Sequence, residues 1–177
     1  ANLNDEVGKH WGNNGNIMAM RAAIQEDTGA EQGSVPVTAY GDLDNPVTPL
    51  LAEQAPFPIG MELRQLLTLA ITKNPNRGYF KYNPATDNAE LYFDKSQMDI
   101  SRRAMRSFID RLNAANGGVL EQFWYFNGQG FGDDFTYHPL GGAVLGLASD
   151  YYGRLKGYKN LYCLDGSMMP GFSACAN

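Results

Sequence analysis

Residues 96–116 read Ser-Gln-Met-Asp-Ile-Ser-Arg-Arg-Ala-Met-Arg-Ser-Phe-Ile-Asp-Arg-Leu-Asn-Ala-Ala-Asn, the most regular pattern in the chain. Its large apolar side chains fall on one helical stripe, at Met98, Ile100, Met105, Phe108, Ile109 and Leu112. Such a stripe is typical of an amphipathic helix that packs one face against a core. Gly117-Gly118 follows and is expected to end the helix. The sequence therefore predicts one long helix here, and the flanking segments decide what it covers.

The segment before this helix predicts a β-hairpin. Tyr79-Phe80-Lys81-Tyr82 and Glu90-Leu91-Tyr92-Phe93 are rich in strand-forming residues, and turn-forming residues 83–88 separate them. Further short strands are predicted at 34–40, 49–55, 119–126 and 159–164. Strands mixed with helices in this way indicate an α+β or α/β fold.

Two other segments complete the prediction. Residues 59–74 are expected to form a second amphipathic helix ending at Pro75, with helical spacing at Leu63, Leu66, Leu67, Ala70 and Ile71. Residues 2–33 are rich in Asn and Gly, with Trp11-Gly12-Asn13-Asn14-Gly15-Asn16 at their centre. This composition predicts a loop that carries backbone groups to a site.

Composition excludes several classes of function. The 177 residues are 44% hydrophobic and 12% aromatic, as in a packed globular protein. With 14 basic and 19 acidic residues the net charge is −5, which argues against a nucleic-acid partner because phosphate binding needs a basic surplus. The two histidines and two cysteines form no metal-ligand spacing, so no metal site is expected. No apolar run approaches the ~20 residues of a membrane-spanning helix.

His138 is the first candidate for chemistry. It lies in Tyr137-His138-Pro139-Leu140-Gly141-Gly142, where the proline restrains the histidine backbone and the glycines permit close approach of a cofactor or a neighbouring segment. A neutral imidazole could accept a proton from an alcohol or donate a hydrogen bond to its oxygen. The sequence leaves both roles open, together with the plain structural alternative.

Glu53 and Asn177 are further candidates. Glu53 stands in the apolar stretch Leu50-Leu51-Ala52-Glu53-Gln54-Ala55-Pro56, where desolvation would make its carboxylate a usable base. Strand periodicity alone slightly favours the alternative that it points to solvent. Asn177 could donate an amide N–H to an electron-rich ring or to a substrate oxygen.

No dinucleotide-binding fingerprint is present in the chain. Gly128-x-Gly130-x-Gly132 follows a strand-like run, but it is not G-x-G-x-x-G and no helix with a packing face follows it.

These motifs together resemble the glucose–methanol–choline (GMC) family of flavin oxidoreductases, and within it the bacterial cholesterol oxidases. The resemblance extends over nearly the whole chain. It rests on residues 11–18, on Ala52-Glu53-Gln54-Ala55-Pro56, on Leu69-Ala70-Ile71-Thr72-Lys73-Asn74-Pro75, on residues 133–142, on residues 157–162 and on Asp165-Gly166-Ser167. The His-Pro-x-Gly-Gly and Asp-Gly-Ser elements are general to the family, whereas the glutamate segment and the Ile-Thr-Lys-Asn-Pro run are more specific to sterol oxidases.

The resemblance implies an FAD enzyme that oxidises a 3β-hydroxysterol with O2 to a ketone and H2O2, and that isomerises the Δ5 double bond to Δ4. It assigns His138 to the substrate hydroxyl, Glu53 to proton transfer between ring carbons, and Asn177 to the flavin. Asp165, Gly166, Asn177 and Tyr137 are then cofactor-binding residues, and Leu51 and Phe57 line the substrate pocket. Leu51 stands where relatives have an aromatic residue that helps to gate an oxygen tunnel.

The resemblance also implies a domain arrangement. Residues 1–152 are expected to belong to an antiparallel-sheet substrate domain with helices, and residues 153–177 to the C-terminal piece of a Rossmann-like FAD domain. Because the fingerprint for FAD is missing, the chain is expected to be a fragment that works with a companion polypeptide carrying the FAD-binding segment. A secreted, extracellular enzyme with transient membrane-surface contact, for sterol extraction, is the corresponding setting.

Two other functions stay open. A GMC oxidase or dehydrogenase of another alcohol would share His-Pro-Leu-Gly-Gly but would need no isomerisation base at Glu53. A non-enzymatic lipid-binding module would use aromatic segments such as Phe123-Trp124-Tyr125-Phe126 to line a pocket.

Overall fold

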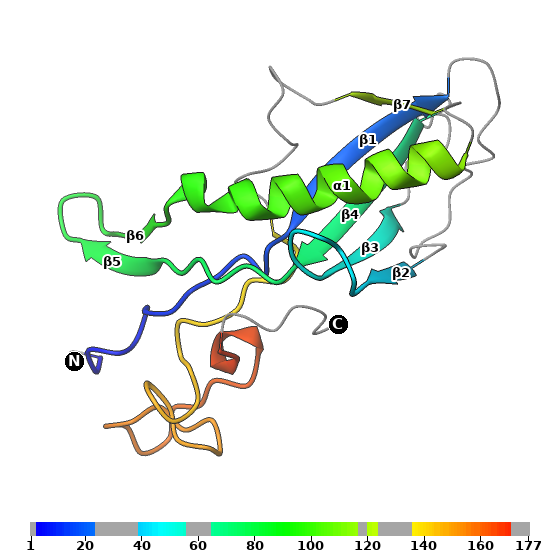
Figure 1. Cartoon of the computed structure of the whole chain (residues 1–177). Coiled ribbons are helices and arrows are strands. Elements are labelled where there is room, and N and C mark those ends of the chain that lie inside the picture. The colour runs from blue at the N-terminus through cyan, green and yellow to red at the C-terminus, as the bar shows by residue number, and fades with distance from the viewer. Residues whose placement is uncertain (1–2, 24–38, 56–64, 117–119, 124–135, 171–177) are drawn as a thin grey trace.

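The described part of the chain forms an antiparallel sheet covered on one face by a long helix (Figure 1). This computed structural model describes residues 3–23, 39–55, 65–116, 120–123 and 136–170. Five strands form the sheet in the order β2-β3-β4-β1-β7, all pairs antiparallel. Their bounds are β1 Ile17–Ala23, β2 Ala39–Asp42, β3 Leu50–Ala55, β4 Gln65–Thr72 and β7 Leu120–Phe123. The antiparallel-sheet part of the predicted fold class is thus confirmed.

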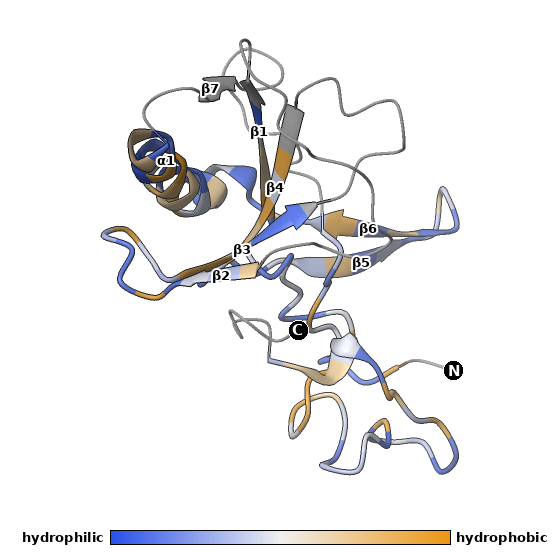
Figure 2. Ribbon diagram, turned by 90° about the vertical axis from the view of Figure 1, so that its right-hand side faces the viewer, coloured by the Kyte–Doolittle hydropathy of each residue, from blue (hydrophilic) through white to orange (hydrophobic). Residues whose placement is uncertain are grey.

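The core lies between the sheet and helix α1 (Asp99–Ala115), and Figure 2 shows α1 on one side of β1 and β4. The helix contributes Ala104, Met105, Phe108 and Ile109, and the strands contribute Ile17, Ala19, Leu50, Ala52 and Ala70. These strand residues alternate along their strands, as expected when every second side chain faces the helix. Burial of this stripe therefore fixes which face of the sheet α1 covers.

The predicted helix over 96–116 is confirmed, with a short 3₁₀ turn, η1 (Lys95–Met98), before it. The Asp94 carboxylate caps this turn by accepting the Ser96 N–H at 3.0 Å. The helix ends at Ala115, with Asn116 as its C-cap, while Gly117-Gly118 lies outside the described residues. In the part of the chain that the structure describes, no helix combines the length and apolar character needed to cross a bilayer.

The predicted hairpin is also confirmed, as β5 (Tyr79–Asn83) and β6 (Asn88–Tyr92). It extends away from the main sheet (Figure 1). Tyr79 and Tyr92 occupy paired positions, and their rings stack with centroids 5.1 Å apart. Most side chains of the hairpin are exposed, so cross-strand pairs of this kind stabilise it more than burial does.

The helix predicted over 59–74 is wrong. Residues 65–72 form strand β4, which lies between β3 and β1, and residues 59–64 fall outside the described residues. A central strand is buried on both faces, and both Leu69 and Ala70 are buried here. Such a strand carries a continuous apolar run, and helical spacing can be found in any continuous run.

Two more predictions need correction. The loop predicted over 2–33 contains strand β1, whose Ile17 and Ala19 face the core. The strand predicted at 159–164 does not form; that segment makes only an isolated bridge between Arg154 and Tyr162. Of the predicted Rossmann-like piece, residues 153–170 show bridges, turns and the 3₁₀ helix η2 (Gly166–Met168), and no strand. The strands predicted at 34–40 and 119–126 overlap β2 and β7 where described.

Candidate functional site

The Asn-rich segment forms a tight turn that leads directly into β1. Asn14 and Gly15 both have positive φ, at 56° and 59°, and the Asn16 N–H donates to the Asn13 carbonyl at 3.2 Å. Two successive positive φ angles define a type I′ turn, for which Asn-Gly is the favoured pair. The Asn13 side chain reinforces the turn, since its Oδ1 accepts the Gly15 N–H at 3.0 Å. This segment is therefore a rigid turn.

The turn holds the segment that carries His138. Asn16 Oδ1 accepts the Tyr137 N–H and the Thr136 hydroxyl, each at 3.0 Å. The Thr136 hydroxyl oxygen in turn accepts the His138 N–H at 3.0 Å. Asn16 is fully buried, and His138 itself is half-buried. The backbone leading to the imidazole is thus fixed by two side chains.

The glycine pair after His138 seats the loop against the N-terminal segment. Gly12 and Leu140 exchange both backbone hydrogen bonds, at 2.8 and 2.9 Å. The Gly142 N–H donates to the Lys9 carbonyl at 2.9 Å. At Gly141, with φ +80°, a Cβ would overlap the His10 carbonyl group. The glycine there is required by close approach of backbone to backbone.

Helix η2 lies against the other edge of the same loop. The Gly141 N–H donates to the Gly166 carbonyl at 3.1 Å, and the Ala143 N–H donates to the Ser167 carbonyl at 2.9 Å. A Cβ on Gly166 would stand 2.7 Å from the Pro139 carbonyl oxygen. The His-Pro-Leu-Gly-Gly loop therefore joins two segments that are far apart in the sequence, and both lie at the same end of the molecule (Figure 1).

Asp165 is exposed and caps η2. Its Oδ1 accepts the Ser167 hydroxyl and the Ser167 N–H, the latter at 3.0 Å. These hydrogen bonds, with the hydroxyl the larger cause, hold the pKa of Asp165 below its ordinary value. The carboxylate is therefore ionised and oriented over most of the pH range.

Glu53 lies on the sheet, on the face opposite α1. Its neighbours Leu50 and Ala52 belong to the core under α1, so alternation along β3 turns Leu51 and Glu53 the other way. Paired antiparallel residues share a face, and Glu53 pairs with Leu69 while Leu51 pairs with Ile71. Glu53 is half-buried there.

The face around Glu53 is apolar in the described strands. Met18, Leu69 and Ile71 are each at most 4% exposed, and Leu51 is half-buried. β1, which carries Met18, begins directly after Asn16, the residue that holds the His138 segment. Within the sheet, Glu53 on β3 is thus connected to the His138 segment through β4 and β1.

Tyr137, another predicted site residue, is 60% exposed, and Asn16 holds its backbone N–H rather than its ring. Asn177 and Phe57 lie outside the described residues. No group of three or more His, Cys, Asp or Glu side chains that could hold a metal ion occurs in the described ranges.

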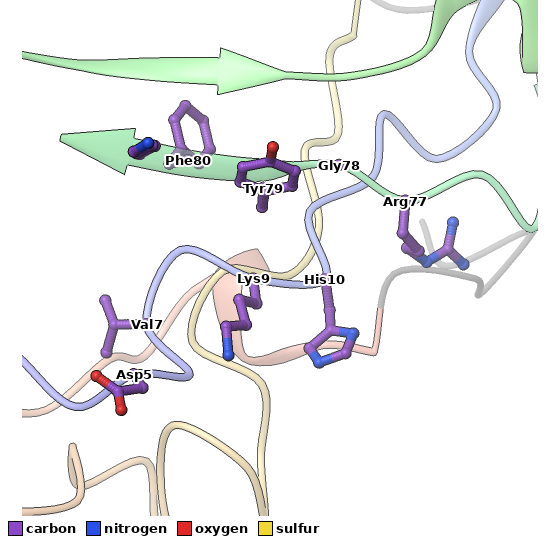
Figure 3. A pocket seen from close by; sticks show the side chains of 9 residues that line it. Asp5, Val7, Lys9, His10, Arg77, Gly78, Tyr79 and Phe80 are labelled. Carbon is purple, nitrogen blue, oxygen red and sulfur yellow. The ribbon is translucent and has the colours of Figure 1, made fainter. Parts of the chain in front are cut away.

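A separate pocket of about 480 Å³ lies where the N-terminal segment pairs with the base of the hairpin (Figure 3). Residues 77–81 line one side, and the other side is lined by Asp5, Val7, Lys9 and His10. The Glu6 carboxylate contacts both basic side chains: its Oε1 lies 2.9 Å from Lys9 Nζ, and its Oε2 lies 3.5 Å from His10 Nε2. Neither His138 nor Glu53 lines this pocket, so it is distinct from the His138 segment.

Sequence reasoning did not single out the buried amides of the turn as site residues. Asn13, Asn14 and Asn16 are at most 4% exposed, and each Nδ2 lacks a hydrogen-bond partner among the described residues. His138 Nδ1 is likewise buried without a described partner. The sequence feature that could have identified these amides is the presence of three asparagines in four positions, which is more than a turn needs.

These orphaned donors provide a test for the cofactor of a flavin enzyme. A buried amide N–H without an acceptor costs about 1–3 kcal/mol, so a bound group rich in acceptors is favoured beside it. The carbonyl oxygens and ring nitrogens of a flavin are such acceptors. The donor set around Asn13, Asn14 and Asn16 therefore fits an FAD group.

A family model described as "GMC oxidoreductase, C-terminal" matches residues 14–125, well over half of the chain. The matched span begins in the Asn-rich turn and includes β1, the Glu53 strand, the hairpin and α1. His138 and Asp165 lie beyond its end. The antiparallel sheet with one long helix agrees with the substrate domain of this FAD-dependent family. The chain therefore belongs to the GMC oxidoreductases and carries a C-terminal domain of that family.

Proposed function

We propose that this chain is the substrate-binding part of an FAD-dependent sterol oxidase, which converts a 3β-hydroxysterol to the ketone with O2 as acceptor and then moves the Δ5 double bond to Δ4. The observation that carries the proposal is Glu53 on an apolar sheet face. Oxidation of a simple alcohol needs no carboxylate there, whereas isomerisation of a steroid ketone needs a base that exchanges a proton with ring carbons.

The apolar face suits a rigid, flat hydrocarbon. Leu51, Leu69 and Ile71 lie beside Glu53 on the same face of the sheet, and of the three only Leu51 is half-buried rather than buried. Burial of the Leu51 side chain against a ring system would contribute about 25 cal/mol per Å² of apolar area removed from water.

His138 acts on the hydroxyl group in this proposal. As the C–H hydride leaves the carbinol carbon, the imidazole accepts the O–H proton and the ketone forms. Bound FAD would supply the acceptor for the hydride, and O2 would take up the two electrons and two protons as H2O2. Glu53 then removes a proton beside the ketone and returns it two carbons further along, so that the double bond becomes conjugated.

FAD would be held jointly. Asp165, Gly166, Tyr137 and Asn177 are proposed contacts from this chain, and residues 153–177 are proposed to complete an FAD domain, with residues 1–152 in the substrate domain. A companion polypeptide would carry the dinucleotide-binding segment that this sequence lacks. We propose an extracellular setting, with brief contact with a membrane surface from which sterol is taken.

The test begins with the visible absorption spectrum of the native sample, before and after anaerobic addition of cholesterol. Flavin bands that bleach with the sterol support the proposal. Flavin bands that do not respond would mean another alcohol substrate, and a sample with no flavin would favour a lipid-binding module.

Glu53→Gln then separates the two steps. This variant is expected to oxidise cholesterol and to accumulate the Δ5 ketone, because only proton transfer between ring carbons is lost. Glu90→Gln, on the exposed hairpin, is the matched control and is expected to give the Δ4 product. Formation of the Δ4 ketone by the Glu53 variant at the unchanged rate would overturn the assignment of Glu53.

A further inference from the structure

The segment that carries His138 is held by hydrogen bonds from its backbone to two side chains. A catalytic imidazole is commonly oriented by a carboxylate or carbonyl that accepts from one ring nitrogen. Here Nδ1 is buried, and no described residue forms a hydrogen bond with it. What is fixed instead is the backbone: Asn16 holds Tyr137, and Thr136 holds His138.

The two side chains are suited to act as one unit. The Thr136 oxygen accepts the His138 N–H, while its own hydrogen points to Asn16 Oδ1 or to the Asn13 carbonyl, each at 3.0 Å. Asn16 Oδ1 also accepts the Tyr137 N–H. Asn16 is fully buried at the start of β1, so the unit is anchored to the sheet itself.

We infer that Asn16 and Thr136 are positioning residues for His138, which set the place of its imidazole relative to substrate through the backbone. This inference rests on the proposed catalytic role of His138. Pro139 supports it, because the residue after His138 then limits the remaining backbone freedom to the extended region. With both sides of His138 restrained, the backbone sets the position of its Cβ, from which the imidazole extends.

The comparison of Thr136→Val with Thr136→Ser tests this in the flavin-loaded enzyme assembled with its companion polypeptide. Valine has nearly the same shape without the hydroxyl, and serine keeps the hydroxyl. We expect Thr136→Val to lower kcat by up to about 100-fold, the usual cost of a misplacement near 1 Å, with little change in KM. Thr136→Ser is expected to restore kcat. Thr48→Val is the control, since Thr48 is another buried threonine, whose hydroxyl donates to the Lys73 carbonyl at 2.8 Å.

Amide hydrogen exchange of the same assembly without substrate gives a readout independent of turnover. Thr136→Val is expected to speed exchange at the His138 N–H about 5- to 10-fold and to spare Tyr137, because it removes one hydrogen bond. Asn16→Leu is expected to speed exchange at the Tyr137 N–H and to spare His138. Asn16→Asp, which keeps an acceptor oxygen, is expected to leave the Tyr137 N–H protected. This second pair also serves if Thr136→Val does not fold.

The outcomes separate this inference from the proposed function. If His138→Gln leaves alcohol oxidation unchanged, the catalytic role of His138 fails. If His138→Gln abolishes turnover while Thr136→Val and Asn16→Leu keep the kcat of the Thr48→Val control, the positioning role is wrong. Unchanged exchange at both amides would likewise overturn it.

Discussion

Gly15 and Thr72 are in direct contact across 57 positions of sequence. The Gly15 carbonyl accepts both the Thr72 N–H at 3.2 Å and the Thr72 hydroxyl at 2.9 Å. The turn that holds the His138 segment is therefore attached to the end of β4, the central strand of the sheet. Through this contact the stability of the sheet supports the geometry of the candidate site.

Gly15→Ala should break this contact. Its φ of +59° costs an alanine about 1–2 kcal/mol, and the new Cβ would overlap the Thr72 carbonyl oxygen. We expect the free energy of unfolding to fall by more than about 2 kcal/mol in chemical denaturation. Gly41→Ala is the control, because a Cβ there meets no described atom within 4 Å. Equal stability of the two variants would contradict the packing at the turn.

The glycine pair after His138 offers a sharper comparison. Gly141 and Gly142 both have positive φ, at 80° and 103°, but only at Gly141 would a Cβ overlap backbone, that of His10. Gly142→Ala should therefore lower the free energy of unfolding by only about 1–2 kcal/mol, through backbone strain, and Gly141→Ala should lower it more. Thermal unfolding measures the difference, and exchange at the Gly12 amide reports whether the loop separates from the N-terminal segment. Gly142→Ala proving the less stable variant would refute the close approach at Gly141.

Local patterns account for the elements that the sequence predicted correctly. The α1 stripe was readable because Met105, Phe108 and Ile109 face a core on one side only, and this one-sided burial leaves a period in the sequence. The hairpin could be predicted from the turn-forming residues 83–88 between its two strands. In β4 the same rules failed, since Leu69 and Ala70 are buried on opposite faces and erase the period.

The site was predictable only by residue type. His138 and Glu53 could be chosen from their neighbours in sequence, but which face of the sheet Glu53 occupies depends on the register of β3 with β4. The bond between Asn16 and Tyr137 joins positions 121 apart, and no local pattern encodes it. Asn16 consequently appeared in the sequence as one turn residue among several.

A buried chain of hydrogen bonds links α1 to the Asn-rich turn and gives a third prediction. The Asn74 amide donates to the Ser101 hydroxyl at 2.8 Å, Ser101 lies 2.6 Å from the Thr72 hydroxyl, and Thr72 donates to Gly15. Ser101→Ala removes the middle of this chain and should cost about 1–3 kcal/mol of stability.

The control for this prediction is Ser107→Ala, at a half-buried position of the same helix, which should change stability by less than about 0.5 kcal/mol. Urea denaturation of both variants makes the comparison. A loss at Ser101 no larger than at Ser107 would mean that the hydroxyl chain does not stabilise the junction between helix and turn.

Asp165 provides the last prediction, which concerns pH. The Ser167 hydroxyl and N–H hold the pKa of Asp165 below its ordinary value, so the ionised carboxylate is the form that caps η2. A lowered pKa in the folded state stabilises the protein above the ordinary pKa, and this contribution is lost as the pH falls through the lowered value. Because Asp165 is exposed, we expect a small effect on global stability and a clear one in NMR titration of its carboxyl carbon.

Ser167→Ala should raise the pKa of Asp165 towards its ordinary value, since the hydroxyl is the largest cause of the shift. Ser96→Ala, which removes the corresponding hydroxyl bond to Asp94 before η1, should raise the pKa of Asp94 and leave Asp165 unchanged. An unchanged Asp165 titration in the Ser167 variant would show that the Ser167 hydroxyl does not hold the carboxylate over η2.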